Sequence, residues 1–187
     1  MKTETTELDG VLLITPDVYA DDRGLLFEAY HAERYRAAGI ATVFVQDNVS
    51  VSCEGVLRGL HFQNPSLQAK LVSVVEGEIF DVAVDVRQGS PAFRRWTAAV
   101  LSAGNHRQIF IPEGFAHGFC VLSGRAVVTY KCSSLYAPGC GLAIAWNDPE
   151  IGIVWPVRSP LLSAADRAAP RLADLPPAQL PAWDAPR

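Results

Sequence analysis

The chain has 187 residues, of which 49% are hydrophobic and 19% charged, so it can bury a full core and we expect one domain over residues 1–187. Its 16 Lys and Arg against 20 Asp and Glu give a net charge of −4, with no basic run that would follow a nucleic-acid backbone or an anionic membrane. This argues against nucleic-acid and membrane partners. Any phosphorylated ligand must be held by a few local groups.

The first seven residues are polar and acidic, and no apolar stretch has the length of a signal peptide or a membrane span. We therefore expect a cytoplasmic protein. The four cysteines, Cys53, Cys120, Cys132 and Cys140, form no Cys-x-x-Cys pair. We predict that they are reduced and mostly buried.

Short apolar or alternating runs between turn residues predict strands, and their spacing indicates a β-sandwich or barrel. In chain order these runs are 11–14, 42–45, 71–75, 79–86, 96–101, 108–111, 119–122 and 126–130. Only the segment from His31 to Ala38, followed by Gly39, reads as a helix. From residue 170 the chain is rich in Ala and Pro, which predicts an extended tail over 170–187.

The run 79–86 alternates, with Val82 and Val84 among its apolar positions and Asp81 and Asp85 among its polar ones. A strand with this pattern packs one face and leaves the other polar. Gly77 lies between this run and the preceding one and can adopt a positive φ angle. We therefore expect a tight hairpin there, with antiparallel pairing of the two strands.

Two histidines lie in settings that favour ligand contact. His61 follows Arg58 and Gly59 closely, and His117 lies next to Gly118, so both backbones can approach a ligand. A lone histidine is more often half-buried, with its ring bound to a backbone carbonyl. His31 and His106 lack such a setting, and we expect them at the surface.

Ordered motifs along the chain resemble the dTDP-4-dehydrorhamnose 3,5-epimerase family. They are Asp21-Asp22-Arg23-Gly24, Glu28, Gln46-Asp47-Asn48-Val49-Ser50, Arg58-Gly59-Leu60-His61, Gln68-Ala69-Lys70-Leu71-Val72, Gly77, the segment 81–87, the segment 112–119, Tyr130-Lys131, Trp146-Asn147-Asp148-Pro149, Trp155-Pro156, and Ser163 with Asp166. The resemblance implies an all-β, cupin-like jelly roll, or double-stranded β-helix, with one or two short surface helices. It also implies a homodimer.

The activity that the resemblance implies is epimerisation of a dTDP-linked 4-keto-6-deoxy sugar at C3, C5 or both, in deoxysugar biosynthesis, without a cofactor or metal. A ketone at C4 acidifies the protons on its two neighbouring carbons, so a neutral imidazole can remove one of them. The implied base is His61, supported by Asp166, and the implied acid on the opposite face is Tyr130. The resemblance further implies that Lys70, with Arg58 and His117 nearby, holds the enolate.

The implied nucleotide contacts are Arg23, Glu28, Gln46, Asn48 and Arg58, with Tyr136 as an aromatic neighbour. A carboxylate can accept a hydrogen bond from the thymine N–H, and an arginine can contact phosphate oxygens through two hydrogen bonds. Taken singly, Arg23 and Glu28 would by default be interpreted as a surface pair beside a turn.

Three positions depart from the pattern of many family members. Gly141 stands where many members have an acidic residue, Ala165 where many have a lysine, and Leu26 where an aromatic residue is frequent. The acid–base set is unaffected, but the edge of the binding pocket is altered. The natural substrate can therefore be another deoxysugar, inverted at one carbon or at both.

Two other functions fit the same fold. A metal-dependent cupin oxygenase is suggested by the segment from Pro112 to His117, but Gln63 replaces the second imidazole expected after His61, and Lys70 would repel a metal cation. A non-catalytic sugar-nucleotide binding module would require no base, supporting carboxylate or acid. No Gly-x-Gly-x-x-Gly motif offers a site for a nicotinamide cofactor.

Overall fold

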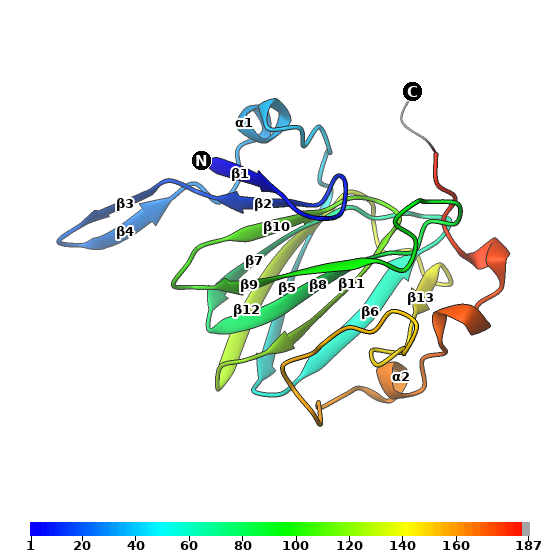
Figure 1. Ribbon diagram of the computed structural model, residues 1–187. Coiled ribbons are helices and arrows are strands. Elements are labelled where there is room, and N and C mark those ends of the chain that lie inside the picture. The colour runs from blue at the N-terminus through cyan, green and yellow to red at the C-terminus, as the bar shows by residue number, and fades with distance from the viewer. Residues whose placement is uncertain (185–187) are drawn as a thin grey trace.

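The computed structural model describes residues 1–184, in which two antiparallel sheets pack face to face and a two-stranded hairpin projects to one side (Figure 1). In spatial order, the six-stranded sheet contains β1 (Lys2–Thr5), β2 (Leu12–Thr15), β10 (Gln108–Ile111), β7 (Lys70–Glu76), β12 (Arg125–Cys132) and β5 (Gln46–Cys53). The five-stranded sheet contains β13 (Gly141–Ala143), β6 (Leu57–Gln63), β11 (Phe115–Val121), β8 (Glu78–Asp85) and β9 (Trp96–Ser102).

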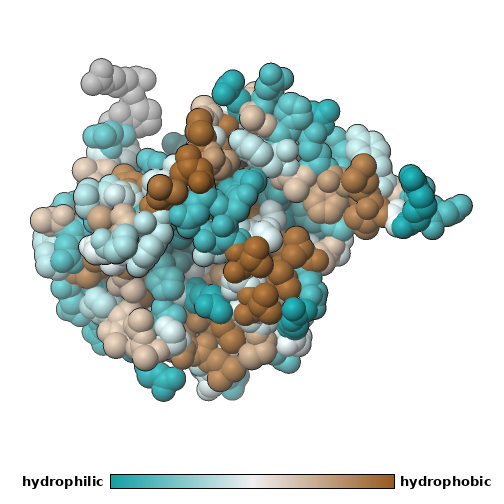
Figure 2. Space-filling view, turned by 180° about the vertical axis from the view of Figure 1, so that it is seen from behind, coloured by the Kyte–Doolittle hydropathy of each residue, from teal (hydrophilic) through white to brown (hydrophobic). Residues whose placement is uncertain are grey.

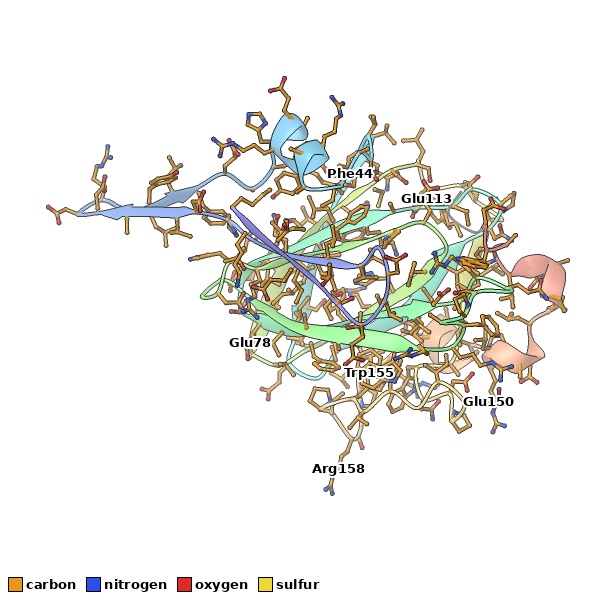
Figure 3. The ribbon with its side chains drawn as sticks, turned by 45° about the horizontal axis from the view of Figure 1, so that its top comes forward. Phe44, Glu78, Glu113, Glu150, Trp155 and Arg158 are labelled. Atoms are coloured by element: carbon orange, nitrogen blue, oxygen red, sulfur yellow. The ribbon has the colours of Figure 1, made fainter. Side chains whose placement is uncertain are left out.

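Between β5 and β13 the chain crosses from one sheet to the other at every step except β8 to β9. This alternation is the winding of a double-stranded β-helix, so the predicted jelly-roll fold is confirmed. The main core lies between the sheets and includes Val72, Ile79, Ala83 and Phe119. Figure 3 shows the side chains that the two sheets and their connecting segments carry.

The Gly77 turn has the predicted positive φ, at 78°, and a Cβ there would lie 2.0 Å from the Arg125 carbonyl oxygen. The predicted pairing across it is wrong. Strand β7 belongs to the six-stranded sheet and β8 to the five-stranded one. The turn therefore carries the chain between the sheets, where the close approach of residue 125 leaves room only for glycine.

Strand β8 has no solvent-facing polar side, contrary to the alternation in its sequence. Asp81 and Asp85 are both 0% exposed, and Ala83, on the same side, lies in the core between the sheets. Val82 and Val84 lie on the other side, in a second cluster with residues of the C-terminal segment. Both faces are covered, so the two carboxylates must be bound inside the protein.

Several predicted elements shift. Residues 42–45 form no strand, and Val43 and Val45 remain 69% and 53% exposed just before β5 begins. The strand expected at 119–122 begins at Phe115, because the segment containing His117 and Gly118 is buried on both faces. Strand β6 was not predicted, since its Arg-Gly-Leu-His sequence lacks a simple alternation.

The C-terminal segment is not simply extended. Between residues 170 and 184 it forms two 3-10 turns, Leu172–Asp174 and Pro177–Gln179, and Leu172 is only 2% exposed. Leu175 and Leu180 also pack on the outer cluster of the five-stranded sheet. The leucines hold this segment against the sheet, whereas residues 185–187 of the predicted tail lie outside the described residues.

The hairpin of β3 (Val18–Asp21) and β4 (Gly24–Phe27) stands away from the sheets and carries exposed apolar side chains. Val18, Tyr19, Leu25 and Leu26 are 39–72% exposed. In Figure 2 the hairpin projects to the right, with apolar surface behind a polar tip. Such a surface on a thin projection is typical of a contact with another chain.

Two short helices complete the fold. Helix α1 (Ala32–Ala37) matches the predicted helix apart from one residue at each end, and α2 (Ala164–Arg167) is a single turn beside β6. All four cysteines are free, with Cys120 and Cys132 buried, Cys140 partly buried and Cys53 exposed. No helix within residues 1–184 has the length and apolar character needed to cross a membrane.

Candidate active site

Two adjoining cavities open between the sheets and share His61, Lys70, Tyr130 and Ala165, so they form one cleft. The inner part, of about 480 Å³, is also lined by Arg58, His117, Phe119, Ser163 and Asp166, with Val49, Ser50 and Val51 from β5. The outer part, of about 710 Å³, adds Gln46, Asn48, Phe62, Gln63, Gln68, Cys132, Tyr136, Gly141, Leu142 and Ala143. Nine of the eleven predicted site residues line this cleft.

Two glycines let the strands that carry the histidines lie unusually close. Gly59 has a φ of 124°, and a Cβ on it would lie 2.5 Å from Gly118 Cα and 2.8 Å from the His117 carbonyl oxygen. Strands β6 and β11 pair here with a shift of register, and His61 lies opposite His117. The glycines next to the histidines thus place both imidazoles on one wall of the cleft.

His61 forms a short hydrogen bond with a buried carboxylate. Its Nε2 lies 2.5 Å from Asp166 Oδ1, and the side chains are 45% and 5% exposed. Ser163 caps α2: its hydroxyl accepts from the Asp166 backbone N–H and donates to Asp166 Oδ2 at 2.8 Å. The carboxylate thus accepts on both oxygens, and the second ring nitrogen of His61, Nδ1, is left for a ligand.

Burial lowers the pKa of His61 below 6.5, and the Asp166 carboxylate opposes this shift without reversing it. The imidazole is therefore neutral at neutral pH, the form that can accept a proton. Asp166 stabilises the charged imidazole once a proton has been taken.

Three nitrogen-bearing side chains lie near His61. His117 Nε2 is 2.9 Å from Oδ2 of the buried Asp81, and Arg58 Nε donates to Ser52 Oγ at 3.1 Å. Burial lowers the pKa of Lys70, while nearby Asp81 is among the groups that raise it. Together these groups can offer positive charge or N–H donors to an oxygen in the cleft.

Tyr130 lies on β12 of the six-stranded sheet, on the wall of the cleft formed by that sheet, whereas His61 belongs to the five-stranded sheet. Burial raises the pKa of Tyr130, so its phenol stays protonated at neutral pH. A base and a proton donor thus face the cleft from different sheets.

At the outer part of the cleft, amide side chains hold a loop. Gln46 donates to Asn48 Oδ1 at 3.1 Å, while its own Oε1 accepts from the Tyr136 backbone N–H at 2.8 Å. The Tyr136 side chain stays 64% exposed. A flat aromatic surface beside amide groups suits a nucleobase.

Arg23 and Glu28 are not brought to the cleft of their own chain. Arg23, at the tip of the hairpin, is paired with Asp21 at 2.5 Å and is 90% exposed. Glu28 follows β4 and is paired with Arg34 at 3.2 Å. The hairpin projects from the body, and within one chain both residues form surface ion pairs, with Asp21 and Arg34 and not with each other as the alternative interpretation had it.

Gln63 does not present a metal ligand to the cleft. Its amide donates to the Ser66 carbonyl and accepts from the Ala137 backbone N–H, so it ties two loops together. Among residues 1–184, no group of three His, Cys, Asp or Glu side chains is placed to hold a metal ion. The residues thus do not fit the ligand set of a metal-dependent cupin.

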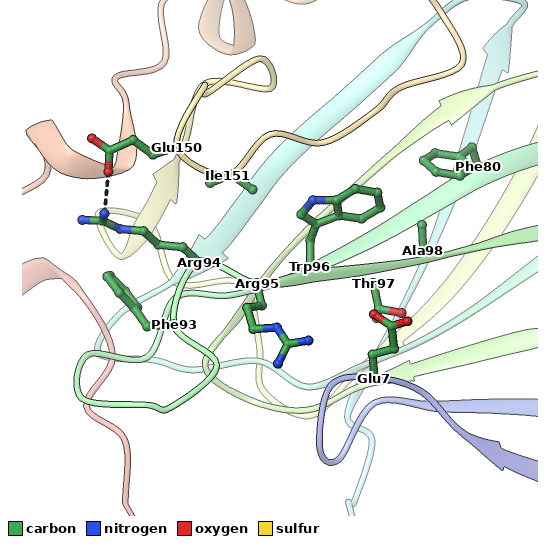
Figure 4. A pocket seen from close by; sticks show the side chains of 10 residues that line it. All are labelled: Glu7, Phe80, Phe93, Arg94, Arg95, Trp96, Thr97, Ala98, Glu150 and Ile151. Atoms are coloured by element: carbon green, nitrogen blue, oxygen red, sulfur yellow. Dashed lines mark ion pairs between the residues drawn. The ribbon is translucent and has the colours of Figure 1, made fainter.

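A separate depression, of about 760 Å³, lies on the outer side of the five-stranded sheet (Figure 4). It is lined by Glu7, Phe80, Phe93, Arg94, Arg95, Trp96, Thr97, Ala98, Glu150 and Ile151. Arg94 is paired with Glu150 at 2.6 Å. The depression contains no histidine, lysine or tyrosine, so the acid–base chemistry belongs to the cleft.

Residues 5–174 match the family described as dTDP-4-dehydrorhamnose 3,5-epimerase. A relative with that name from Methanothermobacter thermautotrophicus is 52% identical over 152 residues, covering 81% of this chain and 82% of the relative. The chain belongs to the dTDP-4-dehydrorhamnose 3,5-epimerase family. The predicted membership is confirmed.

Two solved structures of family members are similar over nearly the whole chain. One is the dTDP-6-deoxy-D-glucose-3,5-epimerase of Legionella pneumophila in complex with dTDP-4-keto-L-rhamnose, with 46% identity, a TM-score of 0.96 and coverage of 98% of this chain and 99% of that chain. The other is a 4-keto-6-deoxy sugar epimerase from the novobiocin biosynthetic gene cluster of Streptomyces spheroides, with 40% identity, a TM-score of 0.93 and coverage of 98% and 94%.

Two of the positions that depart from the family pattern lie in the cleft. Ala165 lines both of its parts, and Gly141 lines the outer part, where a Cβ on it would meet nothing within 4 Å. Leu26 lies on the hairpin and is 72% exposed. Gly141 thus leaves open space in the cleft of this epimerase family member.

Sequence reasoning missed two residues that bind the predicted site residues. Asp81 was assigned only to the polar face of a strand but binds His117, and Ser163 was noted only as part of a motif but binds Asp166. A Ser three residues before an Asp is a capping signal that could have identified the second. Nothing in the alternation of β8 distinguishes a buried aspartate from an exposed one.

Proposed function

We propose that this chain epimerises a dTDP-linked 4-keto-6-deoxyhexose at C3, C5 or both, by moving protons next to the C4 ketone. The observation that carries the proposal is the His61–Asp166 pair on one wall of a cleft whose other wall presents Tyr130. A binding module requires neither a neutral imidazole backed by a buried carboxylate nor an opposing phenol.

In the proposed reaction His61 takes the proton from the carbon next to the ketone, and the electron pair of the broken C–H bond moves onto the C4 oxygen. Lys70, with His117 and Arg58 nearby, stabilises that oxygen as an enolate. Tyr130 then donates its proton to the other face of the carbon, and the C4 ketone re-forms. The phenolate and the imidazolium return to their starting forms by exchanging protons with water, so the net change is an inversion.

The dTDP group is assigned to the outer part of the cleft. Gln46, Asn48 and the exposed ring of Tyr136 lie there, beyond the shared catalytic residues. The Legionella relative, crystallised with dTDP-4-keto-L-rhamnose, supports this class of ligand. The open space at Gly141 also leaves room for a sugar-nucleotide other than the rhamnose precursor, and the Streptomyces relative from the novobiocin biosynthetic gene cluster supports that alternative.

The test is conversion of dTDP-4-keto-6-deoxyglucose, followed by NMR of the product, by the native protein and by the His61→Ala variant in the presence of a chelator. Native protein should invert C3, C5 or both, and the variant should be inactive while it unfolds at the native temperature. A variant with near-native turnover would remove His61 from the base role. Native protein that binds the nucleotide sugar but never inverts it would favour the binding module.

We further propose that the enzyme acts as a homodimer in which the hairpin of one copy reaches the cleft of the other. Arg23 and Glu28 lie outside the cleft of their own chain, and the hairpin exposes Leu25 and Leu26. Leu26→Asp should therefore produce monomers in sedimentation experiments and raise the KM, whereas a variant that stays dimeric with native KM would contradict this arrangement. The exposed thiol of Cys53 supports a reducing, cytoplasmic location.

A further inference from the structure

We infer that Asp81 is a positioning residue of this site, which orients His117 and maintains the charge of Lys70 for binding the C4 oxygen. This inference rests on the proposed function, because it assigns a purpose to groups that hold the enolate. It concerns a residue that lies behind the cleft wall and does not itself line either part of the cleft.

The first observation is that Asp81 is a buried carboxylate with an incomplete set of partners. Its side chain is 0% exposed, and Oδ2 binds His117 Nε2 at 2.9 Å. The other oxygen, Oδ1, is enclosed and has no hydrogen-bond donor among residues 1–184. Enclosing a carboxylate oxygen without a donor is unfavourable, and such groups are rare outside functional sites.

Asp85, four residues further along the same strand, shows what a structural aspartate looks like in this protein. It is also 0% exposed, but its oxygens accept from the Arg87 backbone at 2.9 Å, from the Arg87 guanidinium at 2.7 and 3.0 Å, and from Ser90 Oγ at 2.6 Å. Both carboxylate oxygens of Asp85 are thus hydrogen-bonded by residues within five positions in the chain. Asp81 instead has its single partner in a residue of the cleft.

The second observation concerns the direction of His117. Because the Asp81 carboxylate accepts a hydrogen bond from Nε2, the neutral ring carries its hydrogen on that nitrogen, and Nδ1 is directed away from the carboxylate. His117 lines the inner part of the cleft beside His61 and Lys70. Asp81 therefore fixes the ring orientation and leaves Nδ1 as the nitrogen that can meet a substrate oxygen.

The third observation is electrostatic. Burial lowers the pKa of Lys70, and Cys132 and Asp81 act in the opposite direction. Burial also raises the pKa of the Cys132 thiol, which keeps that group neutral, so the opposing charge is that of Asp81. The other ionisable groups around Lys70 are Arg58 and His61 on β6, His117 on β11, Tyr130 and Cys132 on β12, and Asp166 on α2. Both oxygens of Asp166 are hydrogen-bonded, to His61 and Ser163, whereas Oδ1 of Asp81 has no donor among residues 1–184, so Asp81 is the carboxylate available to balance the ammonium group.

The experiment compares Asp81→Asn with Asp85→Asn as a matched control, since each removes one charge from a fully buried position of β8. Asp81→Asn should lower kcat about tenfold, less than the loss expected on removing an enolate donor itself, with KM changed by less than about twofold. The alkaline limb of its pH–rate profile should move to lower pH, because Lys70 loses its proton more easily. Asp85→Asn should be less stable but keep the native profile.

Native kcat and an unmoved alkaline limb in Asp81→Asn would overturn the inference, as would the same change in both variants. A ¹³C NMR titration of Lys70 without substrate measures directly, without turnover, whether Lys70 loses its proton more easily in Asp81→Asn than in the native protein. A protein without epimerase activity would therefore refute the proposed function and still test this inference.

If Asp81→Asn does not fold, the inference is tested on the native protein and on the Asp81→Glu variant. The ¹⁵N spectrum of native His117 should show a proton on Nε2 at every pH where the protein is folded, and Asp81→Glu should keep the native alkaline limb. A neutral His117 protonated on Nδ1, or a displaced limb in the glutamate variant, would overturn the inference.

Discussion

Replacing Asp166 by asparagine tests the support of the base with little change of shape. Asp166 Oδ1 lies 2.5 Å from His61 Nε2, and a hydrogen bond between charged groups contributes about 1.5–3 kcal/mol. The imidazole is 45% exposed, so solvent screening places the loss in the lower half of that range. The exchange rate should fall about 10- to 30-fold.

A larger loss would follow if the amide forced the wrong tautomer on His61, but Ser163 opposes this. Its hydroxyl lies 2.8 Å from Oδ2 and can turn to accept from an amide N–H there, leaving the amide oxygen toward His61. The assay is the initial rate of deuterium exchange into substrate across pH. The acidic limb of Asp166→Asn should move to lower pH, since the group that raises the pKa of His61 is gone. Native exchange and an unmoved limb would refute the support role of Asp166.

Tyr130→Phe should reduce inversion more than proton exchange, because the phenol delivers the second proton; an equal loss of both, measured by NMR, would contradict its separate role as acid. The native rate should be bell-shaped in pH, with an acidic limb below 6.5 from His61 and an alkaline limb below 10.5 from Lys70, and an acidic limb above 6.5 would contradict the neutral base. Because the pKa of His61 is lower in the folded than in the unfolded protein, the unfolded protein binds a proton more readily at this residue. The free energy of unfolding should therefore fall as the pH decreases from about 6.5 through the folded-state pKa of His61, and this part of the decrease should be absent from a His61→Gln control. Gly59→Ala should lose about 3 kcal/mol of stability, or roughly 6–12 °C in Tm, because its Cβ would meet Gly118 Cα at 2.5 Å; a native Tm would show that β6 and β11 can separate.

Local patterns in the sequence predicted seven of the thirteen strands within residues 1–184, whereas the residues of the cleft were predicted from the resemblance to a family. Alternation and turn residues located β7, β8, β9 and β10 to within one or two residues. The ordered motifs indicated the family, and nine of the eleven site residues line the cleft.

What could not be predicted depends on which elements lie opposite each other. Gly77 looks like a hairpin turn in sequence, and only the position of β12 shows that it joins two sheets. Asp81 looks solvent-facing until β11 places His117 beside it. Arg23 and Glu28 lie on or beside a projecting hairpin, away from the cleft of their own chain, so one chain does not show whether they reach the cleft of another copy.

The most direct test of the proposed chemistry is deuterium incorporation into dTDP-4-keto-6-deoxyglucose in heavy water, followed at C3 and C5 by NMR with the native protein and with His61→Ala. The proposed mechanism predicts exchange at C3, C5 or both with native protein and none above background with the variant. Binding of the nucleotide sugar without exchange at either carbon, or equal exchange by both proteins, would contradict proton transfer by His61.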